Sequence, residues 1–228
     1  MIRTILKKIV RLSRKLFKPE KQQDYFLRHT TGVVHVGANI GQERRLYDRH
    51  DLDVVWIEPN PHAFDELLIN ILPFERQKAF RYLLTDTDGD NVELNLANNS
   101  GASSSIFKLG AHKAIWPEVH YVGSIIMMSS TLDTFLKTKD IDLSKHDTLV
   151  MDTQGSELLV LKGARESLKN FKFIKTEAAD FDSYIGCCKI DELNSYLIQN
   201  GFKELGRWPF PENIDGAGYF DVLYEREV

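Results

Sequence analysis

The stretch Val33-Val34-His35-Val36-Gly37-Ala38-Asn39-Ile40-Gly41-Gln42 decides the fold of this 228-residue chain. An apolar run that contains three valines ends at a glycine-containing turn, and a polar segment able to form a helix follows. This order is typical of a buried parallel strand that leads through a tight loop into a helix. Gly37 and Gly41 can adopt backbone angles that a Cβ atom forbids, or let the backbone approach a ligand closely. We therefore expect a ligand-binding turn here.

A second strand repeats the pattern and ends in a carboxylate, in Asp53-Val54-Val55-Trp56-Ile57-Glu58. A glycine turn after the first strand and an acid after the second are how nucleotide-binding α/β proteins hold a ribose. The glycines of the turn are spaced G-x-x-x-G, which differs from the G-x-G-x-x-G that cradles a pyrophosphate. The pattern therefore favours a cofactor that has a ribose and no phosphates, such as S-adenosylmethionine.

Length and charge point to one domain and a separate leader. Residues 22–228 are enough for one large α/β domain. The net charge is −4, but residues 1–21 hold eight basic side chains and one acidic, so the leader carries +7 and the remainder −11. A basic end on an acidic body argues against nucleic acid as a partner, because a nucleic-acid footprint is a basic face.

In the leader, residues 1–21, apolar residues recur at three- and four-residue spacing among basic ones, which predicts a basic amphipathic helix that ends at Pro19. Such a helix can lie on an anionic membrane, or it can pack on the acidic domain. No apolar run reaches the twenty or so residues of a membrane span, and no signal-peptide pattern is present. The only cysteines, Cys187 and Cys188, are adjacent and are expected to be reduced. We expect a cytoplasmic protein, with the inner membrane face as a place where the leader could hold it.

Strands and helices alternate along the rest of the chain. Five buried strands are predicted, at residues 31–36, 53–58, 80–84, 148–151 and 171–176, and two closing strands at 202–208 and 219–224. Helices are predicted at residues 43–51, 62–71, 158–170 and 190–200, with another that begins at Thr131. Residues 92–96 are expected to leave the parallel core as an antiparallel strand, and residues 98–128 to be irregular apart from a short strand at 125–128. The fold class is α/β, a doubly wound Rossmann-like sheet of about seven strands, mostly parallel with a closing antiparallel strand.

Four of the five buried strands end in an acid, and ligands of open α/β sheets bind at these ends. Glu58 can accept hydrogen bonds from both ribose hydroxyls, or it can cap the following helix. Asp86 can accept from an adenine amino group, or serve only as a turn former. Asp152 and Glu177 end the fourth and fifth strands. Asp152 can act as a base, or it can cap a helix or support the turn at Gly155.

Several blocks of this chain resemble the FkbM-type methyltransferases, over about residues 31 to 205. The matching blocks are Val34-His35-Val36-Gly37-Ala38-Asn39-Ile40-Gly41, Ile57-Glu58-Pro59-Asn60-Pro61, Thr131-Leu132-Asp133, Met151-Asp152-Thr153-Gln154-Gly155-Ser156-Glu157-Leu158 and Val160-Leu161-Lys162-Gly163. The glycine turn is shared by many methyltransferases, whereas D-x-x-G-x-E followed by V-L-x-G is far more specific. His35 stands where the family usually has aspartate, and Met151 where isoleucine is common.

The resemblance implies a class I, S-adenosylmethionine-dependent fold and O-methyl transfer, often to a sugar hydroxyl of a glycan, glycolipid or natural product. By the resemblance, Gly37, Ala38, Asn39 and Gly41 line the methionine part of the cofactor, Glu58 holds the ribose, and Asp152 lies beside the reactive methyl.

A sugar hydroxyl needs a base, because it is a weak nucleophile until it is deprotonated. Asp152 is the first candidate, with Glu177 and His112 behind it; His112 can equally be an exposed surface histidine. No spacing of His, Cys or acidic residues requires a metal, so none is predicted. We expect a saccharide or glycolipid acceptor, chosen by residues 98–128 and the turn from Pro209 to Gly218. Two alternatives remain open: a nucleotide-dependent oxidoreductase, and a non-catalytic membrane-associated binding module with this fold.

Overall fold

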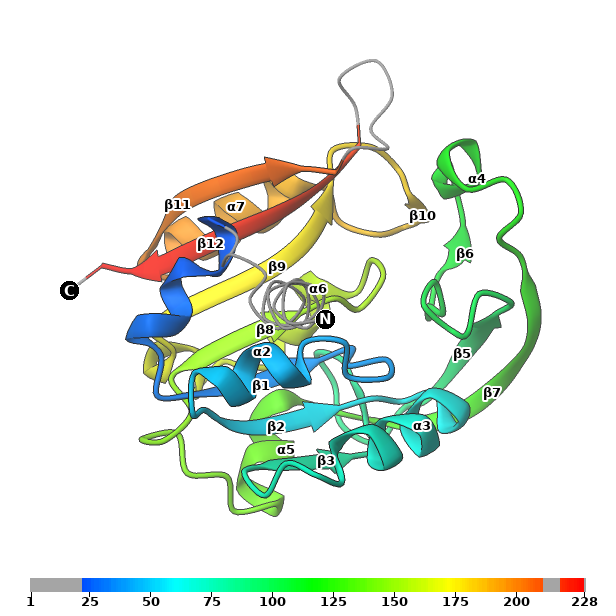
Figure 1. The fold of residues 1–228 in the computed structure, drawn as a ribbon. Coiled ribbons are helices and arrows are strands. Elements are labelled where there is room, and N and C mark those ends of the chain that lie inside the picture. Colours follow the sequence, from blue (N-terminus) through cyan, green and yellow to red (C-terminus); the bar gives the residue numbers. More distant parts are fainter. Residues whose placement is uncertain (1–21, 211–217, 228) are drawn as a thin grey trace, which may run out of the picture.

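The main sheet of the computed structural model has seven strands in the order β11-β12-β9-β8-β1-β2-β3 (Figure 1). The structure describes residues 22–210 and 218–227. The strands are β1 (Gly32–Val36), β2 (Asp53–Ile57), β3 (Gln77–Phe80), β8 (Thr148–Met151), β9 (Phe173–Ala179), β11 (Phe202–Pro209) and β12 (Tyr219–Arg226). Strand β12 is antiparallel to both of its neighbours, β9 and β11, whereas β3, β2, β1, β8 and β9 pair in parallel. The predicted α/β fold with one antiparallel closing strand is confirmed.

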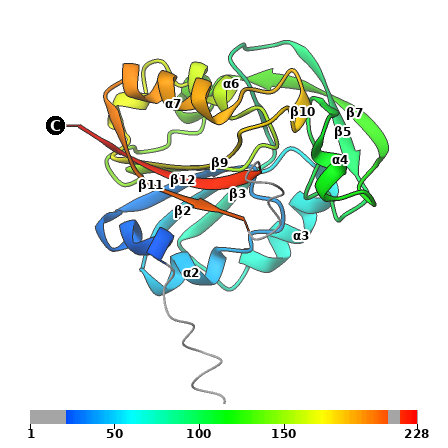
Figure 2. The same cartoon turned by 90° about the horizontal axis from the view of Figure 1, so that it is seen from above.

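Helices cover both faces of this sheet, as the view in Figure 2 shows. One face carries η1 (Gln22–His29), α2 (Arg44–Arg49) and α3 (Pro61–Ile71), and the other carries α5 (Leu132–Thr138), α6 (Glu157–Lys162), η2 (Leu168–Asn170) and α7 (Ile190–Gln199). Alternate residues of each strand enter two separate cores. Val33 packs with residues of η1, α2 and α3, whereas Val34 packs with residues of α5, α6 and α7. Both faces of β1 are therefore buried, which explains its continuous apolar run.

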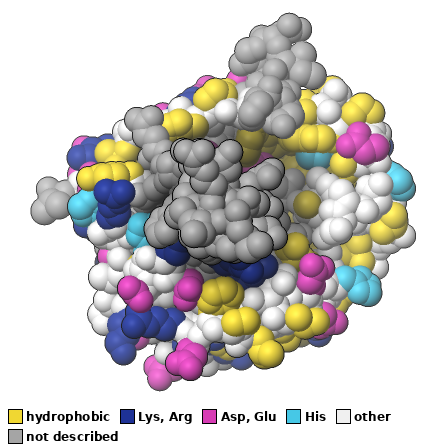
Figure 3. Space-filling view, in the orientation of Figure 1, with side chains coloured by type: hydrophobic (Ala, Val, Ile, Leu, Met, Phe, Trp, Pro, Cys, Tyr) yellow, Lys and Arg dark blue, Asp and Glu magenta, His cyan; other side chains and the backbone are white. Residues whose placement is uncertain are grey.

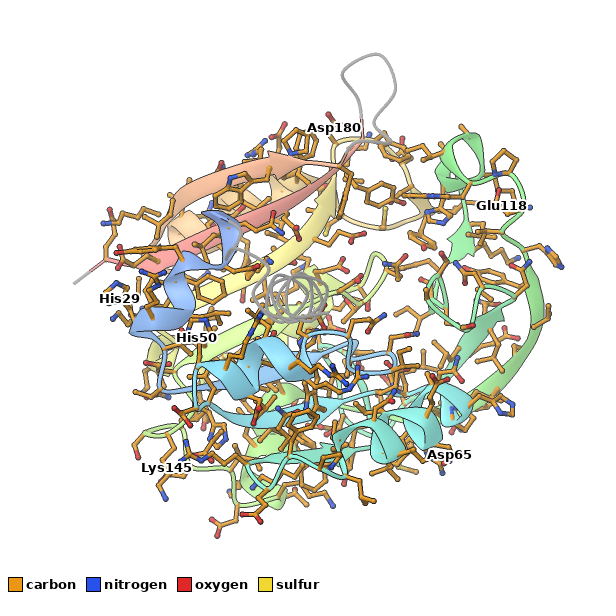
Figure 4. All side chains as sticks on the ribbon, in the orientation of Figure 1. His29, His50, Asp65, Glu118, Lys145 and Asp180 are labelled. Carbon is orange, nitrogen blue, oxygen red and sulfur yellow. The ribbon has the colours of Figure 1, made fainter. Side chains whose placement is uncertain are left out.

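The segment between β3 and α5 forms one small sheet and contributes a strand to another, both beside the carboxyl ends of the main strands (Figure 1). Strands β4 (Leu83–Leu84), β7 (Tyr121–Ser130) and β5 (Asn91–Ala97) make one sheet, and β6 (Lys108–Leu109) pairs with β10 (Tyr184–Ile185) in the other. The short helix α4 (His112–Ile115) lies between β6 and β7. Glu118, after α4, lies on the side of the molecule opposite His29, which comes just before β1 (Figure 4). The carboxyl ends of the strands therefore face the small sheets.

The third strand of the main sheet differs from its prediction. It spans Gln77–Phe80, whereas Leu83 and Leu84 of the predicted strand belong to β4. Gln77 is buried in spite of its polarity, because its side chain accepts from the indole of Trp56 at 3.1 Å and donates to the carbonyl of Arg44 at 2.8 Å. A buried glutamine with partners on two distant elements does not look like a strand residue in the sequence.

The helix predicted at residues 158–170 is two shorter elements, α6 and η2. The break comes at Gly163, where a Cβ atom would lie 2.2 Å from the backbone oxygen of Thr85. The carboxylate of Asp133 then accepts from the backbone N–H groups of Glu166 and Ser167, at 2.8 and 2.9 Å. These contacts with distant segments replace the hydrogen bonds that a continuous helix would make.

The region 98–128 is more regular than predicted. The antiparallel strand at residues 92–96 is confirmed as part of β5, but its partner β7 has ten residues where a four-residue strand is predicted. Its partly apolar residues lie on both faces of the strand, so the sequence has no simple alternation. Regular β structure thus lies beside the carboxyl ends of the main strands, where an irregular segment is predicted.

On the described part of the face in Figure 3, acidic and basic side chains are interspersed with hydrophobic ones. Within residues 22–210 and 218–227, no helix is both long and apolar enough to cross a membrane. The predicted leader helix at residues 1–21 and most of the turn from Pro209 to Gly218 lie outside the described residues.

Candidate active site

The glycine turn after β1 is held by its neighbours on both sides. The N–H groups of Gly37 and Ala38 donate to the carbonyl of Ile57 at 2.9 and 3.1 Å. Gly37, Asn39 and Gly41 have positive φ angles of 78°, 45° and 72°, which glycine adopts without a steric penalty. The positive φ angles at positions 37 and 41 therefore explain why the turn has glycine at both.

Glu58 connects this turn to the end of β2. Its side chain is buried, and its two oxygens accept from the backbone N–H groups of Asn39 at 2.7 Å and Asn60 at 2.8 Å. The N-cap of α3 is Asn60, whose side chain accepts from His62 N at 3.0 Å, so Glu58 does not cap that helix. Burial raises the pKa of Glu58 to about 7, although both N–H groups act in the opposite direction. Each oxygen keeps a lone pair free for a further donor.

A cavity of about 580 Å³ begins at this turn and continues over the ends of β8, β9 and β12. Of the predicted cofactor residues, Gly37, Ala38, Asn39, Glu58 and Asp152 line it. Gly41 does not line the cavity; its α carbon packs on α3, where a Cβ atom would lie 2.7 Å from the Leu67 side chain.

Asp152 and Glu177 meet at the far part of the cavity. The N–H of Asp152 donates to Val36 O at 3.0 Å, which joins the end of β8 to the end of β1. Gln154 Nε2 donates to Asp152 Oδ1 at 2.5 Å and lies 3.5 Å from Glu177 Oε1. Glu177 lies within β9, although the sequence predicts it just after the strand.

The two carboxyl groups have raised pKa values. Burial, together with the charges of Glu157, Glu43 and Asp221, raises the pKa of Asp152 to about 7, while the bond from Gln154 acts to lower it. Burial and the charge of Asp152 raise the pKa of Glu177 well above its ordinary value. Asp152 is therefore able to exchange a proton close to neutral pH.

Glu157 supports the loop between these carboxylates and α6. Its carboxylate accepts from Thr153 N at 2.8 Å and from Gly155 N at 3.1 Å. The sequence left open that Asp152 supports the turn at Gly155. In the structure the Glu157 side chain provides this support. Of the two acids in the D-x-x-G-x-E block, Asp152 lines the cavity and Glu157 does not.

Several charged cavity residues were not predicted from the sequence, among them Asp221 and Lys175. Asp221 on β12 pairs in register with Glu177 on β9, so both side chains lie on the same face of the sheet. Lys175, two residues before Glu177, forms an ion pair with Asp24 of η1 at 3.1 Å. Asp221 gives no signal in the sequence, because only the register between β12 and β9 brings it to the site.

His112 is far from an exposed surface histidine, and it does not line the cavity. Its ring is 2 % exposed, its Nδ1 lies 2.6 Å from the Tyr219 hydroxyl, and its Nε2 lies 3.1 Å from Ser103 Oγ. Burial lowers its pKa to about 4, so the ring is neutral at pH 7. With both nitrogens engaged, His112 ties α4 to β12 and is not placed to take a proton from a ligand.

Asp86 also lies outside the cavity. It follows β4, and it lines a separate hollow of about 500 Å³ together with Asp88, Lys162 and Arg165. The sequence placed it at the end of the third strand of the main sheet, but that strand ends at Phe80. Its predicted contact with an adenine amino group therefore has no support from its position.

His35 occupies the strand position where aspartate is usual in the family that the sequence resembles. Its ring is buried on the η1–α2 face, and its Nδ1 lies 3.0 Å from the Tyr47 hydroxyl on α2. Burial, helped by the charge of Lys175, lowers its pKa to about 3. It is a neutral, buried residue that joins β1 to α2 and lines the cavity together with Tyr47.

Comparison with known proteins agrees with this geometry. Residues 35–204 match the methyltransferase FkbM domain. The chain belongs to the FkbM methyltransferase family. The 2-O-methyltransferase NoeI of Sinorhizobium fredii (strain NBRC 101917 / NGR234) is 28 % identical over 199 residues, which cover 84 % of this chain and 77 % of NoeI. The structure of M. capricolum TrmK in complex with S-adenosyl-homocysteine has a TM-score of 0.51 at 9 % identity, and covers 92 % of this chain and 70 % of TrmK.

Membership of the FkbM family makes this chain an S-adenosylmethionine-dependent methyltransferase with the class I fold, as predicted. The alternative of a nucleotide-dependent oxidoreductase is therefore wrong. The residues present fit the cofactor: Glu58 has free lone pairs for ribose hydroxyls, and it lines the cavity together with Gly37 and Ala38 of the turn. Among the described residues, no three His, Cys, Asp or Glu side chains are arranged to hold a metal ion.

Proposed function

We propose that this FkbM methyltransferase transfers a methyl group from S-adenosylmethionine to a hydroxyl group of a saccharide. The observation that carries the proposal is the position of Asp152. Its carboxyl group lines the same cavity as Gly37 and Glu58, and its backbone is hydrogen-bonded to the strand that leads into the glycine turn. A carboxyl group able to accept a proton thus lies in the space where the cofactor is expected, which supports the proposal.

When bound, S-adenosylmethionine supplies an electrophilic methyl group. The task of the protein is to align the acceptor oxygen and to take its proton. Asp152, with a pKa of about 7, is partly ionised at neutral pH and can accept that proton. Glu177 lies next to it, and burial together with the charge of Asp152 raises its pKa well above the ordinary value; in its protonated form it can hold an acceptor oxygen by donating a hydrogen bond.

The chemistry of the cavity favours a polyhydroxyl acceptor. Asp152, Glu177 and Asp221 line it with carboxyl oxygens, and these accept hydrogen bonds from hydroxyl groups. Phe210 lines the same cavity and offers an apolar surface for a sugar ring. The relative NoeI is described as a 2-O-methyltransferase, which supports oxygen as the methylated atom. Glycans, glycolipids and glycosylated natural products all present such groups.

The test is methyl transfer itself. The full chain is incubated with labelled S-adenosylmethionine and fractionated cell-envelope glycans, and the products are identified by mass analysis. We expect a methyl group on a sugar oxygen, and its loss with Asp152→Asn. Asp65→Asn, an exposed carboxylate on α3, is the matched control and should keep full activity (Figure 4). Tight binding of the cofactor without transfer to any hydroxyl acceptor would favour the non-catalytic binding module.

We also propose that residues 1–21 hold the enzyme on an anionic membrane surface, where lipid-linked saccharides are available. Their charge of +7 supports this. Binding of the full chain and of a chain without residues 1–20 to anionic liposomes is compared by co-sedimentation. We expect the deletion to abolish binding; equal partition of the two proteins would remove the proposal.

A further inference from the structure

Gln154 has a backbone conformation that is unfavourable for its side chain. It lies in the loop between β8 and α6 with φ +55°, in the left-handed region, and is followed by Gly155 with φ +104°. A residue with a long side chain costs free energy in this conformation, and glycine does not. Contacts of the Gln154 side chain are therefore expected to offset the strain of its backbone.

The backbone around Gln154 is fixed from two sides. Its carbonyl accepts from Ser105 Oγ at 2.7 Å. The N–H groups on either side of it, of Thr153 and Gly155, both donate to the carboxylate of Glu157. The Cα–Cβ direction of Gln154 is therefore set by contacts that do not involve its own amide group.

The amide group of Gln154 connects three other side chains. Its Nε2 donates to Asp152 Oδ1 at 2.5 Å and lies 3.5 Å from Glu177 Oε1, and its Oε1 accepts from the Tyr184 hydroxyl at 2.5 Å. Tyr184 is 1 % exposed and its ring stacks on His112, with 5.2 Å between the ring centres. Because the Tyr184 hydroxyl occupies the oxygen end of the amide, the nitrogen end is turned toward the two carboxyl groups.

The surroundings of these carboxyl groups are negative. The charged groups that face Asp152 and Glu177 are Glu43 before α2, Glu157 on α6 and Asp221 on β12. The nearby ammonium of Lys175 is already paired with Asp24 at 3.1 Å. Among the described residues, Gln154 is the only side chain that donates a hydrogen bond to either carboxyl group.

We propose that Gln154 is the positioning residue of the methyl-transfer site: its amide, oriented by Tyr184, holds the Asp152 carboxylate in place and keeps it ionised beside Glu177. The inference rests on the proposed function, in which Asp152 takes the proton of the acceptor. Gln154 is not among the residues that line the large cavity, so it acts through Asp152 and does not touch the acceptor.

The structure offers a variant that removes the side chain without straining the backbone. Glycine suits φ +55°, so Gln154→Gly relieves the backbone, while the loss of the amide leaves the buried Tyr184 hydroxyl without its acceptor; the thermal midpoint measures the balance of the two effects. Asp140→Gly is the matched control, since Asp140 is exposed and has φ +51° outside the cavity. We expect Gln154→Gly to lower kcat about tenfold or more, with little change in the affinity for S-adenosylhomocysteine, and Asp140→Gly to change neither.

The decisive measurement is the titration of Asp152 by NMR with carbon-labelled aspartate carboxyl groups, which needs no acceptor. Loss of a donor to a carboxylate raises its pKa. We expect a higher pKa for Asp152 in Gln154→Gly, a smaller increase in Tyr184→Phe, and none in Asp140→Gly. As the pH is lowered, the activity of Gln154→Gly should then begin to decline at a higher pH than that of the wild type, because the base becomes protonated earlier.

Equal Asp152 pKa values in wild type and Gln154→Gly would overturn the role of Gln154 and leave the proposed methyl transfer standing. A shifted Asp152 pKa in a protein that methylates no hydroxyl acceptor would support the contact and overturn the proposed function. Lower activity at every pH, with an unmoved pKa, would also contradict the inference, because it would reduce Gln154 to a merely structural role.

Discussion

The backbone carbonyl of Asp152 stands where a side chain on Gly37 would have to be. A Cβ atom built on Gly37 would lie 1.9 Å from that oxygen, and the φ angle of Gly37 is +78°. The first residue of the glycine turn and the residue proposed as the base are therefore packed backbone against backbone. This close approach of Asp152 to the turn requires a residue without a Cβ atom at position 37.

Gly37→Ala is expected to damage both the fold and cofactor binding. The left-handed conformation alone costs about 1–2 kcal/mol for alanine, and the contact with Asp152 adds to it. Thermal unfolding and calorimetric titration with S-adenosylhomocysteine measure the two effects. Gly123→Ala is the control, since a Cβ atom there has no neighbour within 4 Å. Wild-type affinity in Gly37→Ala would contradict the packing described here.

Glu58→Gln is expected to weaken cofactor binding by about 10- to 100-fold. The glutamine has the same size, but its amide nitrogen cannot accept from Asn39 N or Asn60 N, so one backbone donor loses its buried partner, at about 1–3 kcal/mol. The measurement is the dissociation constant for S-adenosylhomocysteine. Glu66→Gln, an exposed acid on α3, should bind like the wild type. An unchanged constant in Glu58→Gln would remove Glu58 from the ribose site.

Asp152→Asn is expected to stabilise the protein at high pH while it abolishes methyl transfer. The pKa of Asp152 rises from 3.8 to about 7 on folding, so the folded state binds more protons in this range, and the unfolding free energy contributed by this group falls as pH rises. Asparagine removes this loss and still accepts from Gln154. We expect the free energy of unfolding of Asp152→Asn to exceed that of the wild type by about 1–2 kcal/mol at pH 8, a figure that already allows for the partial exposure of the side chain. At pH 4 we expect almost no difference. Urea unfolding at the two pH values measures it, and an equal effect at both would refute the raised pKa.

Asp133→Asn is expected to lower stability without changing the chemistry. In the T-L-D block, Asp133 accepts from Glu166 N, Ser167 N and Ser167 Oγ, and so joins α5 to the segment after α6. Asparagine can replace only part of these bonds, at a cost of about 1–3 kcal/mol. Its kcat at a temperature well below unfolding should equal that of the wild type. A selective loss of kcat with an unchanged thermal midpoint would show that this block has a catalytic role instead.

The elements that the sequence predicted well are those whose partners are close in the chain or whose two faces are both buried. Strands β1, β2 and β8 are short apolar runs with a turn or an acid at the end, and α3 begins with Asn60 and Pro61 as a helix start should. Strand β3 was misplaced because the partners of Gln77 are Trp56 and the backbone of Arg44. No local pattern contains that information.

The same distinction applies to the site. Glu58 and Asp152 could be found because each directly follows a recognisable strand. Asp221 could not, since its place depends on the register between β12 and β9, and Gln154 could not, since its partners come from β8, β9 and β10. His112 was given a solvent-facing alternative, but Trp116, Tyr184 and Tyr219 surround its ring.

The distribution of charge around the cavity has a consequence for the order of biosynthetic events. The described residues that line it include six acidic side chains, Asp24, Glu43, Glu58, Asp152, Glu177 and Asp221, against two cations, Arg49 and Lys175, so acidic groups outnumber basic ones although burial favours the protonated form of several of them. A phosphate on the sugar would bring further negative charge into this field, where like charges repel. A sugar joined directly to a diphosphate is thus expected to be a poor acceptor, whereas a sugar further along a lipid-linked chain is not, so methylation should follow the transfer of the sugar to its chain.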